Sequence, residues 1–357
     1  MSRNAQYRSF NGRWLGWWLC LGLGLLFDGK ARAQATNGVG ASHVPSARVF
    51  IAEDPDATFD LVPDPVKIHG MVDRTMLDLT GKTTVSQAWK TLVATDDVVG
   101  IKVFSTPGPN SGTRREVVAA IVQDLLGAGL PATNIIVWDR RLVELRIAGY
   151  YELERRFGIR IAGSSDVGYD SKVFYETPLL GNLIYSDLEF GQTGPGIGRK
   201  SYVSKLLTHQ LTKIINVTPL LHHNIMGVSG NLFSLAMGSV DNIARFEISG
   251  DDMARAVPEI YALPSLGDRV VLNVVDALIC QYEGQSHGLL HYSTVLNQLR
   301  FSKDPVALDV LSLQEINRQR ELAGVEVEHT NFDLYANASL LEIGVSDPHQ
   351  IKVVKVP

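Results

Sequence analysis

The sequence has 357 residues, of which 45% are hydrophobic and 20% are charged, with 2 cysteines and a formal net charge of -5. This composition excludes a disordered polar chain, a small domain held together by disulfides and a collagen-like repeat. The acidic balance also argues against a nucleic-acid-binding protein, because such proteins carry a basic surface. The chain is long enough for one large globular domain or two ordinary ones.

Residues 1–35 are predicted to be a secretory signal peptide. Three arginines precede an apolar run over residues 14–27, and the small residues Ala33 and Ala35 close the segment. A basic start, an apolar stretch too short to span a bilayer and small residues at the cleavage point are typical of such signals. An uncleaved membrane anchor is the alternative. We therefore expect a periplasmic or secreted protein, with no stable membrane insertion after cleavage.

Cleavage after Ala35 would leave residues 36–48 as a small, polar and flexible lead-in to a domain over residues 49–357. Only Cys280 would then remain, so an internal disulfide, a cysteine-ligated iron–sulfur cluster and a four-cysteine zinc site are excluded. The cleaved chain would also be more acidic, because the leader contains five basic residues and one acidic residue. DNA, RNA and anionic lipid are therefore not expected partners.

The domain is predicted to have an α/β fold. A β-branched apolar run at residues 98–104 is followed by a loop at 105–112 and by apolar residues at helical spacing over 115–126. The next apolar run, at 134–138, completes a strand–helix–strand unit. Such a βαβ unit predicts a parallel or mixed sheet with helices on both faces. The domain could also be divided into two lobes.

The same alternation continues along the chain. A helix predicted over 142–157 leads to a strand at 160–162, and residues 165–212 are less regular. The remaining predicted elements are strands at 213–217 and 270–277, a helix at 304–322 and a strand at 351–356.

Ligands of α/β proteins gather at the carboxyl ends of the strands, so residues at these ends are candidates for a site. Lys102 interrupts an apolar strand. It either lies at a sheet edge with its ammonium in water, or points the ammonium into a cleft to bind an anion or act with a lowered pKa. Asp139 follows the next strand and is either the N-cap of the following helix or a site carboxylate.

Two adjacent histidines, His222 and His223, follow the strand at 213–217 and a break at Thr218-Pro219. Neighbouring side chains on irregular backbone point in different directions, so we expect one of them, His223, to reach the cleft. An imidazole there could move a proton or bind a metal. A surface histidine or a hydrogen-bonded core histidine is the alternative.

A fourth group contains Asp276 and Glu283, with His287 and His291 further along. Glu283, His287 and His291 are spaced four residues apart, which on a helix would place them on one face as metal ligands. The intervening glycines disfavour such a helix. The sequence therefore leaves the presence of a metal open.

The sequence segments that contain these candidate residues resemble those of the bacterial and archaeal family catalogued as domain of unknown function 362. The similarity covers residues 90–356 and is carried by segments 99–103, 136–139, 215–223, 272–277 and 304–309. The family is largely uncharacterised. Many members have lysines at positions where this chain has Leu221 and Phe233, and appended ferredoxin-type cysteines that this chain lacks. The resemblance therefore implies neither a lysine-tethered cofactor nor a built-in cluster here.

We expect an exported enzyme that acts on a small anionic metabolite by acid/base chemistry in a strand-end cleft. A non-catalytic periplasmic ligand-binding or maturation protein is the alternative. A small molecule is the expected partner, while the cofactor and the oligomeric state stay open. The expected catalytic residues are Lys102, Asp139 and His223, and the expected substrate-binding residues are Arg114, Asn216, Asp276 and Glu283.

Overall fold

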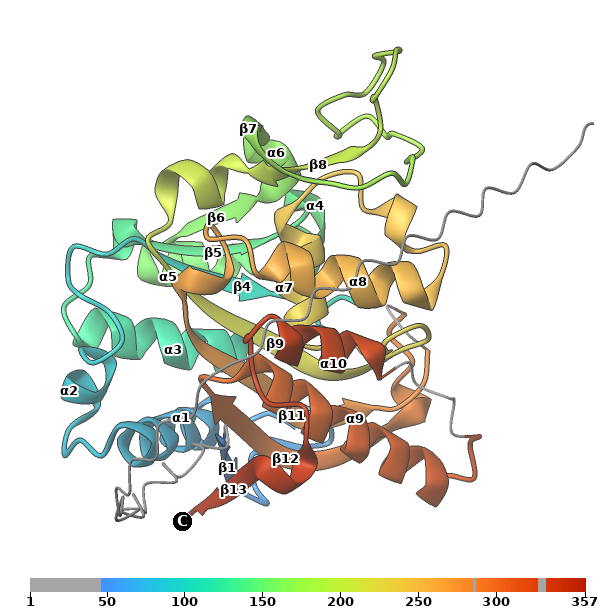
Figure 1. Ribbon diagram of the computed structural model, residues 1–357. Coiled ribbons are helices and arrows are strands. Elements are labelled where there is room, and N and C mark those ends of the chain that lie inside the picture. Colours follow the sequence, from blue (N-terminus) through green and yellow to red (C-terminus); the bar gives the residue numbers. More distant parts are fainter. Residues whose placement is uncertain (1–45, 285–286, 327–331) are drawn as a thin grey trace, which may run out of the picture. The chain divides into compact units, whose positions relative to one another are not determined.

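The computed structural model describes residues 46–284, 287–326 and 332–357 (Figure 1). The expected signal peptide therefore lies outside the described residues, as does most of the lead-in. The first strand, β1 (Ala47–Glu53), begins inside the lead-in expected at 36–48. All of the described residues belong to one compact unit.

The described residues form a nine-stranded mixed sheet. Its strands are β1, β4 (Val99–Val103), β5 (Ile135–Asp139), β6 (Arg160–Gly163), β9 (Lys213–His223), β10 (Gly227–Val228), β11 (Val270–Gln281), β12 (Ser293–Ser302) and β13 (Ile351–Val356). The spatial order is β13-β1-β12-β11-β9-β4-β5-β6, with β10 paired to β9. Along this order only β12 runs against its neighbours, β1 and β11. The predicted α/β fold with a mixed sheet is confirmed.

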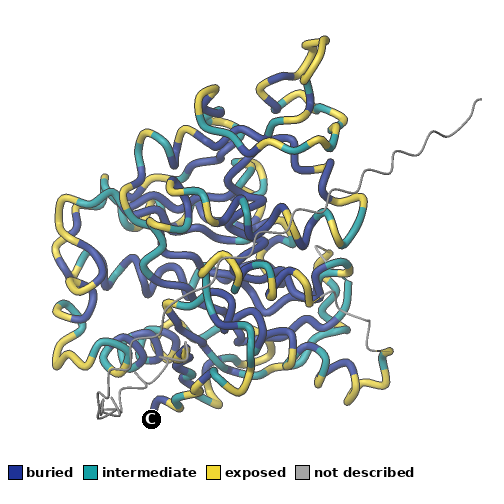
Figure 2. Tube along the Cα trace, viewed as in Figure 1, coloured by how far each residue is buried: buried dark blue, intermediate teal, exposed yellow. Residues whose placement is uncertain are grey.

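Helices cover both faces of the sheet. One face packs on α1 (Pro65–Thr80), α2 (Val85–Trp89), α3 (Arg115–Gly127) and α5 (Tyr151–Phe157). The other face packs on α7 (Asn231–Ser239), α8 (Gly250–Tyr261), α9 (Pro305–Leu322) and α10 (Asp333–Leu340). The central strands β4, β5, β9 and β11 are buried along almost their whole length, as expected of a sheet covered on both sides, and Figure 2 shows this buried centre.

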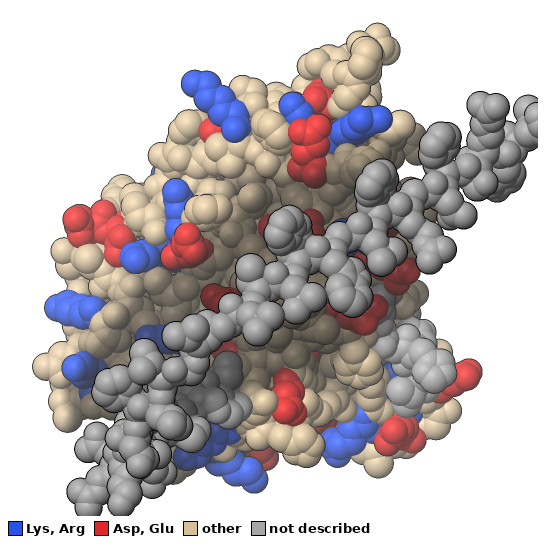
Figure 3. Space-filling model, in the orientation of Figure 1, with Lys and Arg blue, Asp and Glu red and all other residues tan. Residues whose placement is uncertain are grey.

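Smaller elements lie around this core. The short helices α4 (Leu142–Ile147) and α6 (Ser164–Val167) follow β5 and β6. A hairpin joins β2 (Thr58–Phe59) to β3 (Val62–Pro63), and β7 (Tyr169–Glu176) pairs antiparallel with β8 (Lys200–Ser204) across a long connection. Basic and acidic side chains are interspersed on the face drawn in Figure 3. Within the described part of the chain, no helix has the length and apolar character needed to cross a membrane.

Two predicted elements differ from the structure. The helix predicted over 142–157 is two helices, α4 and α5, because the chain turns at Gly149, whose φ of 84° lies in the left-handed region that glycine tolerates. The strand predicted at 213–217 continues through Pro219 to His223. β4 pairs with β9 only as far as Val217, so one edge of β9 is unpaired at Pro219 and accommodates a residue without an N–H.

The order of the strands creates a crevice beside β4. After β4 the chain passes through α3 to β5 on one side, whereas β9 pairs with the other side of β4. The connections that leave the carboxyl ends of β4 and β9 therefore diverge. Parallel sheets bind ligands at such switch points, so this edge of the sheet is where a site is expected.

Candidate functional site

A cavity of about 380 Å³ lies at the carboxyl ends of β4, β5 and β9. Its walls include Phe104 and Thr106 after β4, Asp139 and Arg140 after β5, and His223 at the end of β9. Helices α7 and α8 supply a further part of the wall. This volume suits a small metabolite.

Lys102 lies beside this cavity with no exposed surface. Its Nζ is 2.8 Å from Asp139 Oδ1 and donates to Val103 O at 2.7 Å and to Ser234 Oγ at 3.1 Å. An ammonium has three N–H groups, and these three acceptors use them all. Lys102 thus holds Asp139 and α7 in place and keeps no N–H for an anion. The edge-strand alternative is wrong, because β4 lies between β5 and β9.

The Asp139 carboxylate is also saturated with hydrogen bonds. Besides Lys102, its Oδ1 accepts from Arg140 N at 2.8 Å, and its Oδ2 accepts from both N and Oγ of Ser105 at 2.7 Å. The N-cap alternative is wrong, because the first N–H of α4, on Leu142, donates to Asp166. Asp139 therefore links the loops that follow β4 and β5 at the wall of the cavity.

Helix α7 is held at both of its ends, by Asp309 at its start and by the packing of Gly238 on Lys102 near its end. Asp309 of α9 accepts the N–H groups of Asn231 and Leu232 at the start of α7, at 2.6 and 2.9 Å. Near the other end, Gly238 packs against Lys102 so closely that a Cβ would overlap it. Sequence reasoning missed these positions. The only signal was Asp309 at the end of segment 304–309.

His223 lines the cavity in a defined tautomer. Its Nδ1 accepts the N–H groups of Ile225 and Met226, both at 3.2 Å, and its ring lies 4.5 Å from the Phe233 ring between centroids. Burial, aided by the nearby His222, lowers the pKa of His223 to about 4. At neutral pH the imidazole is therefore uncharged, and because Nδ1 accepts, its proton is on Nε2.

Charged side chains from the start of α4 complete the lining. Burial raises the pKa of Glu144, and the negative charge of Asp139 raises it further. Glu144 Oε2 accepts from Thr106 Oγ1 at 3.2 Å, and its Oε1 lies 3.3 Å from Arg141 Nη1. Arg140 also lines the cavity. The cavity thus combines guanidinium groups with a carboxyl group that takes up a proton more readily than an exposed glutamate.

Three of the predicted substrate-binding residues lie outside the cavity lining. Arg114 and Asp276 form a second buried pair, with Nη1 3.0 Å from Oδ1 and Arg114 N donating to Oδ2 at 2.9 Å. Asn216, the β9 partner of Lys102, donates to Asn231 O at 2.9 Å and so helps to hold α7. These contacts tie the sheet to its helices.

Glu283, the fourth predicted substrate-binding residue, is also outside the cavity lining. Its Oε2 is 2.8 Å from Arg320 Nη1, and the same nitrogen is 3.1 Å from His222 Nε2. The two histidines face different partners because successive side chains alternate along β9; the irregular backbone expected at this point is wrong, since β9 is continuous through His223. Among the described residues, Glu283, His287 and His291 form no group with metal-ligand distances.

Comparison with known proteins gives a family but no activity. No curated protein matches the chain. A solved structure of a protein from Thermotoga maritima is similar over 75% of this chain and 61% of its own, with 11% sequence identity and a TM-score of 0.41. This chain therefore spans less than two thirds of that protein's length. A family model matches residues 99–314, which are more than half of the sequence. The segments quoted above, from β4 to α9, lie in this region, and the chain belongs to the family described as "Domain of unknown function (DUF362)".

Proposed function

We propose that this protein is an enzyme that binds a small anionic metabolite in the strand-end cavity and transfers a proton to or from it. One observation carries the proposal: a neutral imidazole, His223, and a carboxyl group of raised pKa, Glu144, line the same cavity. Pairs of titratable groups whose surroundings shift their pKa values in this way are typical of acid/base sites.

Each lining residue has a role that follows from its chemistry. Arg140 supplies the positive charge for an anionic group. The Nε2–H of His223 donates a hydrogen bond to an oxygen on which negative charge develops, and Glu144 takes the proton. Lys102 and Asp139 are positioning residues here, because their hydrogen-bonding capacity is used within the protein.

Proton transfer next to a carboxylate can be followed without knowing the reaction. The protein is incubated in D₂O with a panel of 2-hydroxy acids, 2-oxo acids and amino acids, and loss of the Cα–H signal is followed by proton NMR. We expect exchange on at least one compound, abolished in Glu144→Gln and slowed by about 10²–10³-fold in His223→Gln. Glu321→Gln, at an exposed position in α9, is the matched control and should exchange at the wild-type rate.

The second candidate, a non-catalytic ligand-binding or maturation protein, is favoured by the saturation of Lys102 and Asp139. Saturable binding of a panel compound without Cα–H exchange would overturn the enzyme proposal and support this alternative. In that case His223→Gln would only weaken binding.

We also propose that the protein is exported, on the basis of the basic and apolar pattern of residues 1–35. Expression of the full chain in a bacterial host, followed by N-terminal sequencing of the periplasmic fraction, is expected to give Thr36 as the first residue. A product that starts at Met1 in the membrane fraction would support an uncleaved anchor.

A further inference from the structure

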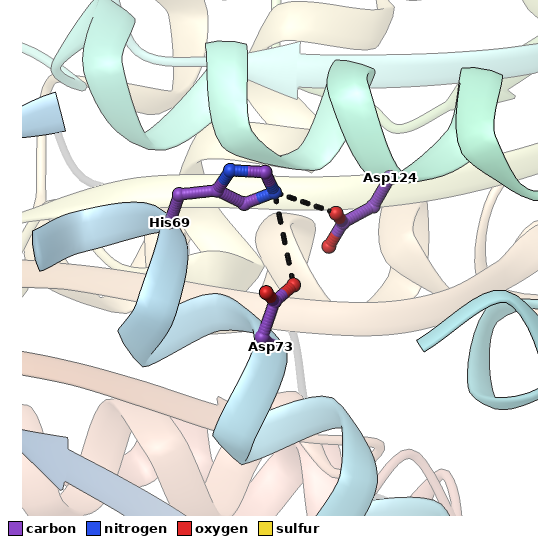
Figure 4. Close-up of side chains that lie close together, drawn as sticks. All are labelled: His69, Asp73 and Asp124. Atoms are coloured by element: carbon purple, nitrogen blue, oxygen red, sulfur yellow. Dashed lines mark hydrogen bonds and ion pairs between the residues drawn. The ribbon is translucent and has the colours of Figure 1, made fainter. Parts of the chain in front are cut away.

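A second cluster of titratable side chains lies between α1 and α3, on the face of the sheet opposite α7. His69 and Asp73 are one turn apart on α1, and Asp124 projects toward them from α3 (Figure 4). His69 Nε2 is 2.7 Å from Asp124 Oδ1 and 3.7 Å from Asp73 Oδ1. The cluster shares no residue with the strand-end cavity.

We propose that His69, Asp73 and Asp124 bind a divalent transition-metal cation, with Zn²⁺ as the best match. One imidazole nitrogen and two carboxylate oxygens are a donor set that zinc accepts, whereas Ca²⁺ and Mg²⁺ prefer oxygen alone. The three ligand atoms lie within 4.8 Å of one another. Zinc bonds of about 2.0–2.1 Å imply ligand atoms about 3.3 Å apart, and the distances of 2.7 and 3.7 Å lie on either side of this value.

An unsatisfied oxygen supports this assignment independently of the residue types. Asp73 Oδ1 is shielded from solvent and accepts no hydrogen bond from the described residues, and its contact with His69 Nε2, at 3.7 Å, is too long for one. A shielded carboxylate oxygen without a donor is costly unless something fills its place. A cation between the three side chains would supply that missing partner.

The surroundings of Asp124 match those of a metal ligand. Trp89 Nε1 donates to its second oxygen, Oδ2, at 2.9 Å, which orients the carboxylate toward His69 as outer hydrogen bonds orient metal ligands. A divalent cation between two carboxylates and an imidazole would offset the repulsion of the two negative charges.

The side chains that α1 contributes reach the surface, although Asp73 Oδ1 itself is shielded. The side chains of His69 and Asp73 are 33% and 36% exposed, whereas that of Asp124 is 5% exposed. A cation can therefore enter over α1 and keep a water in its fourth position. Binding places the metal on His69 Nε2, so any proton on that nitrogen leaves to solvent or moves to Nδ1.

A simple ion pair that joins α1 to α3 is the competing explanation for the contact between His69 and Asp124. Asp73→Asn separates the two, because it keeps that contact and removes one metal ligand. Zn²⁺ is titrated calorimetrically into the full chain, free of any affinity tag, at pH 7.5. We expect one equivalent to bind the wild type, with a rise in melting temperature, and at least about tenfold weaker binding to Asp73→Asn.

Asp78→Asn is the matched control, because Asp78 is exposed on the same helix, and it should bind Zn²⁺ like the wild type. Co²⁺ should give the visible absorption of a four-coordinate site in the wild type and Asp78→Asn, and lose it in His69→Gln. A wild type that binds no Zn²⁺ would overturn the proposal, as would equal affinities of the wild type and Asp73→Asn. Neither result would bear on proton transfer in the strand-end cavity.

Discussion

Gly238 of α7 lies against the side chain of Lys102 with no room for a Cβ. An added Cβ would overlap Lys102 Cε and lie 2.9 Å from Nζ, closer than packed atoms approach each other. Since the Lys102 ammonium holds Asp139 at 2.8 Å, the absence of a side chain at 238 lets the helix cross directly over the ion pair. The packing of α7 and the shape of the cavity wall are thus linked at one position.

Gly238→Ala is expected to push Lys102 away from Asp139. Overpacking of this kind costs about 1–3 kcal/mol of unfolding free energy, measurable by urea denaturation. Gly127→Ala is the matched control, because Gly127 is also helical and has nothing within 4 Å of its added Cβ. That variant should be neutral or gain up to about 1 kcal/mol from better helix propensity. Equal stability of the two variants would contradict the close packing of Gly238.

Lys102→Met is expected to cost about 3–5 kcal/mol of unfolding free energy, because it leaves the buried Asp139 carboxylate without its counter-charge. Adding Asp139→Asn removes that charge, so the double variant should regain part of the loss. A double-mutant cycle by urea denaturation measures this coupling. Additive losses in the two single variants would show that the ion pair is not energetically coupled.

Because burial lowers the pKa of His223, we expect the free energy of unfolding to depend on pH. Its pKa is about 4 in the folded protein, below its ordinary value of 6.5, so between these values the unfolded chain takes up a proton that the folded protein does not. Stability is therefore full above about pH 6.5 and falls as the pH drops toward 4, by on the order of 3 kcal/mol. Urea denaturation at pH 7 and pH 4.5 measures the loss.

In His223→Gln this contribution to the loss should vanish. His349→Gln, at an exposed position, should lose as much stability as the wild type between the same pH values. The carboxylates that titrate in this range are common to all three proteins and cancel in the comparison. If His223→Gln lost as much stability as the wild type, His223 would not be a neutral buried imidazole.

Asp309→Ala is expected to loosen the start of α7. The change leaves the N–H groups of Asn231 and Leu232 buried without an acceptor, at a cost of about 1–3 kcal/mol. Asp64→Ala removes the more exposed cap of α1 and should cost about 1 kcal/mol. Hydrogen exchange at Asn231 and Leu232 should accelerate only in Asp309→Ala. Unchanged exchange there would mean that Asp309 does not fix the helix.

The sequence predicted the central strands because their signals are local. β4 and β5 are short apolar runs bounded by loops, and the chain around them has the periods of a βαβ unit. Helix α7 escaped prediction because all nine of its residues are buried, so it has no polar face and no helical period. β12 escaped as well, since its pairing with β1 joins segments at opposite ends of the domain.

The site was partly predictable for a similar reason. Asp139 and His223 were found from their places at strand ends, and both line the cavity. Glu283 and Asp276 also follow apolar segments, but each pairs with an arginine from a distant part of the chain, Arg320 and Arg114. The sequence shows which charged residues stand at the ends of strands. Which residue pairs with each of them depends on tertiary packing, which the sequence pattern does not show.

The placement of β1 between β12 and β13 has a consequence for how the protein is made. Residues 47–53 leave the ribosome early, yet both of their neighbours in the sheet come from the last quarter of the chain. Until then this apolar strand has two open edges, which are the features that lead nascent chains to aggregate or to recruit a holding chaperone. Synthesis and assembly of β1 thus proceed in different orders, because its pairing can be completed only after residues 293–302 and 351–356 have been made.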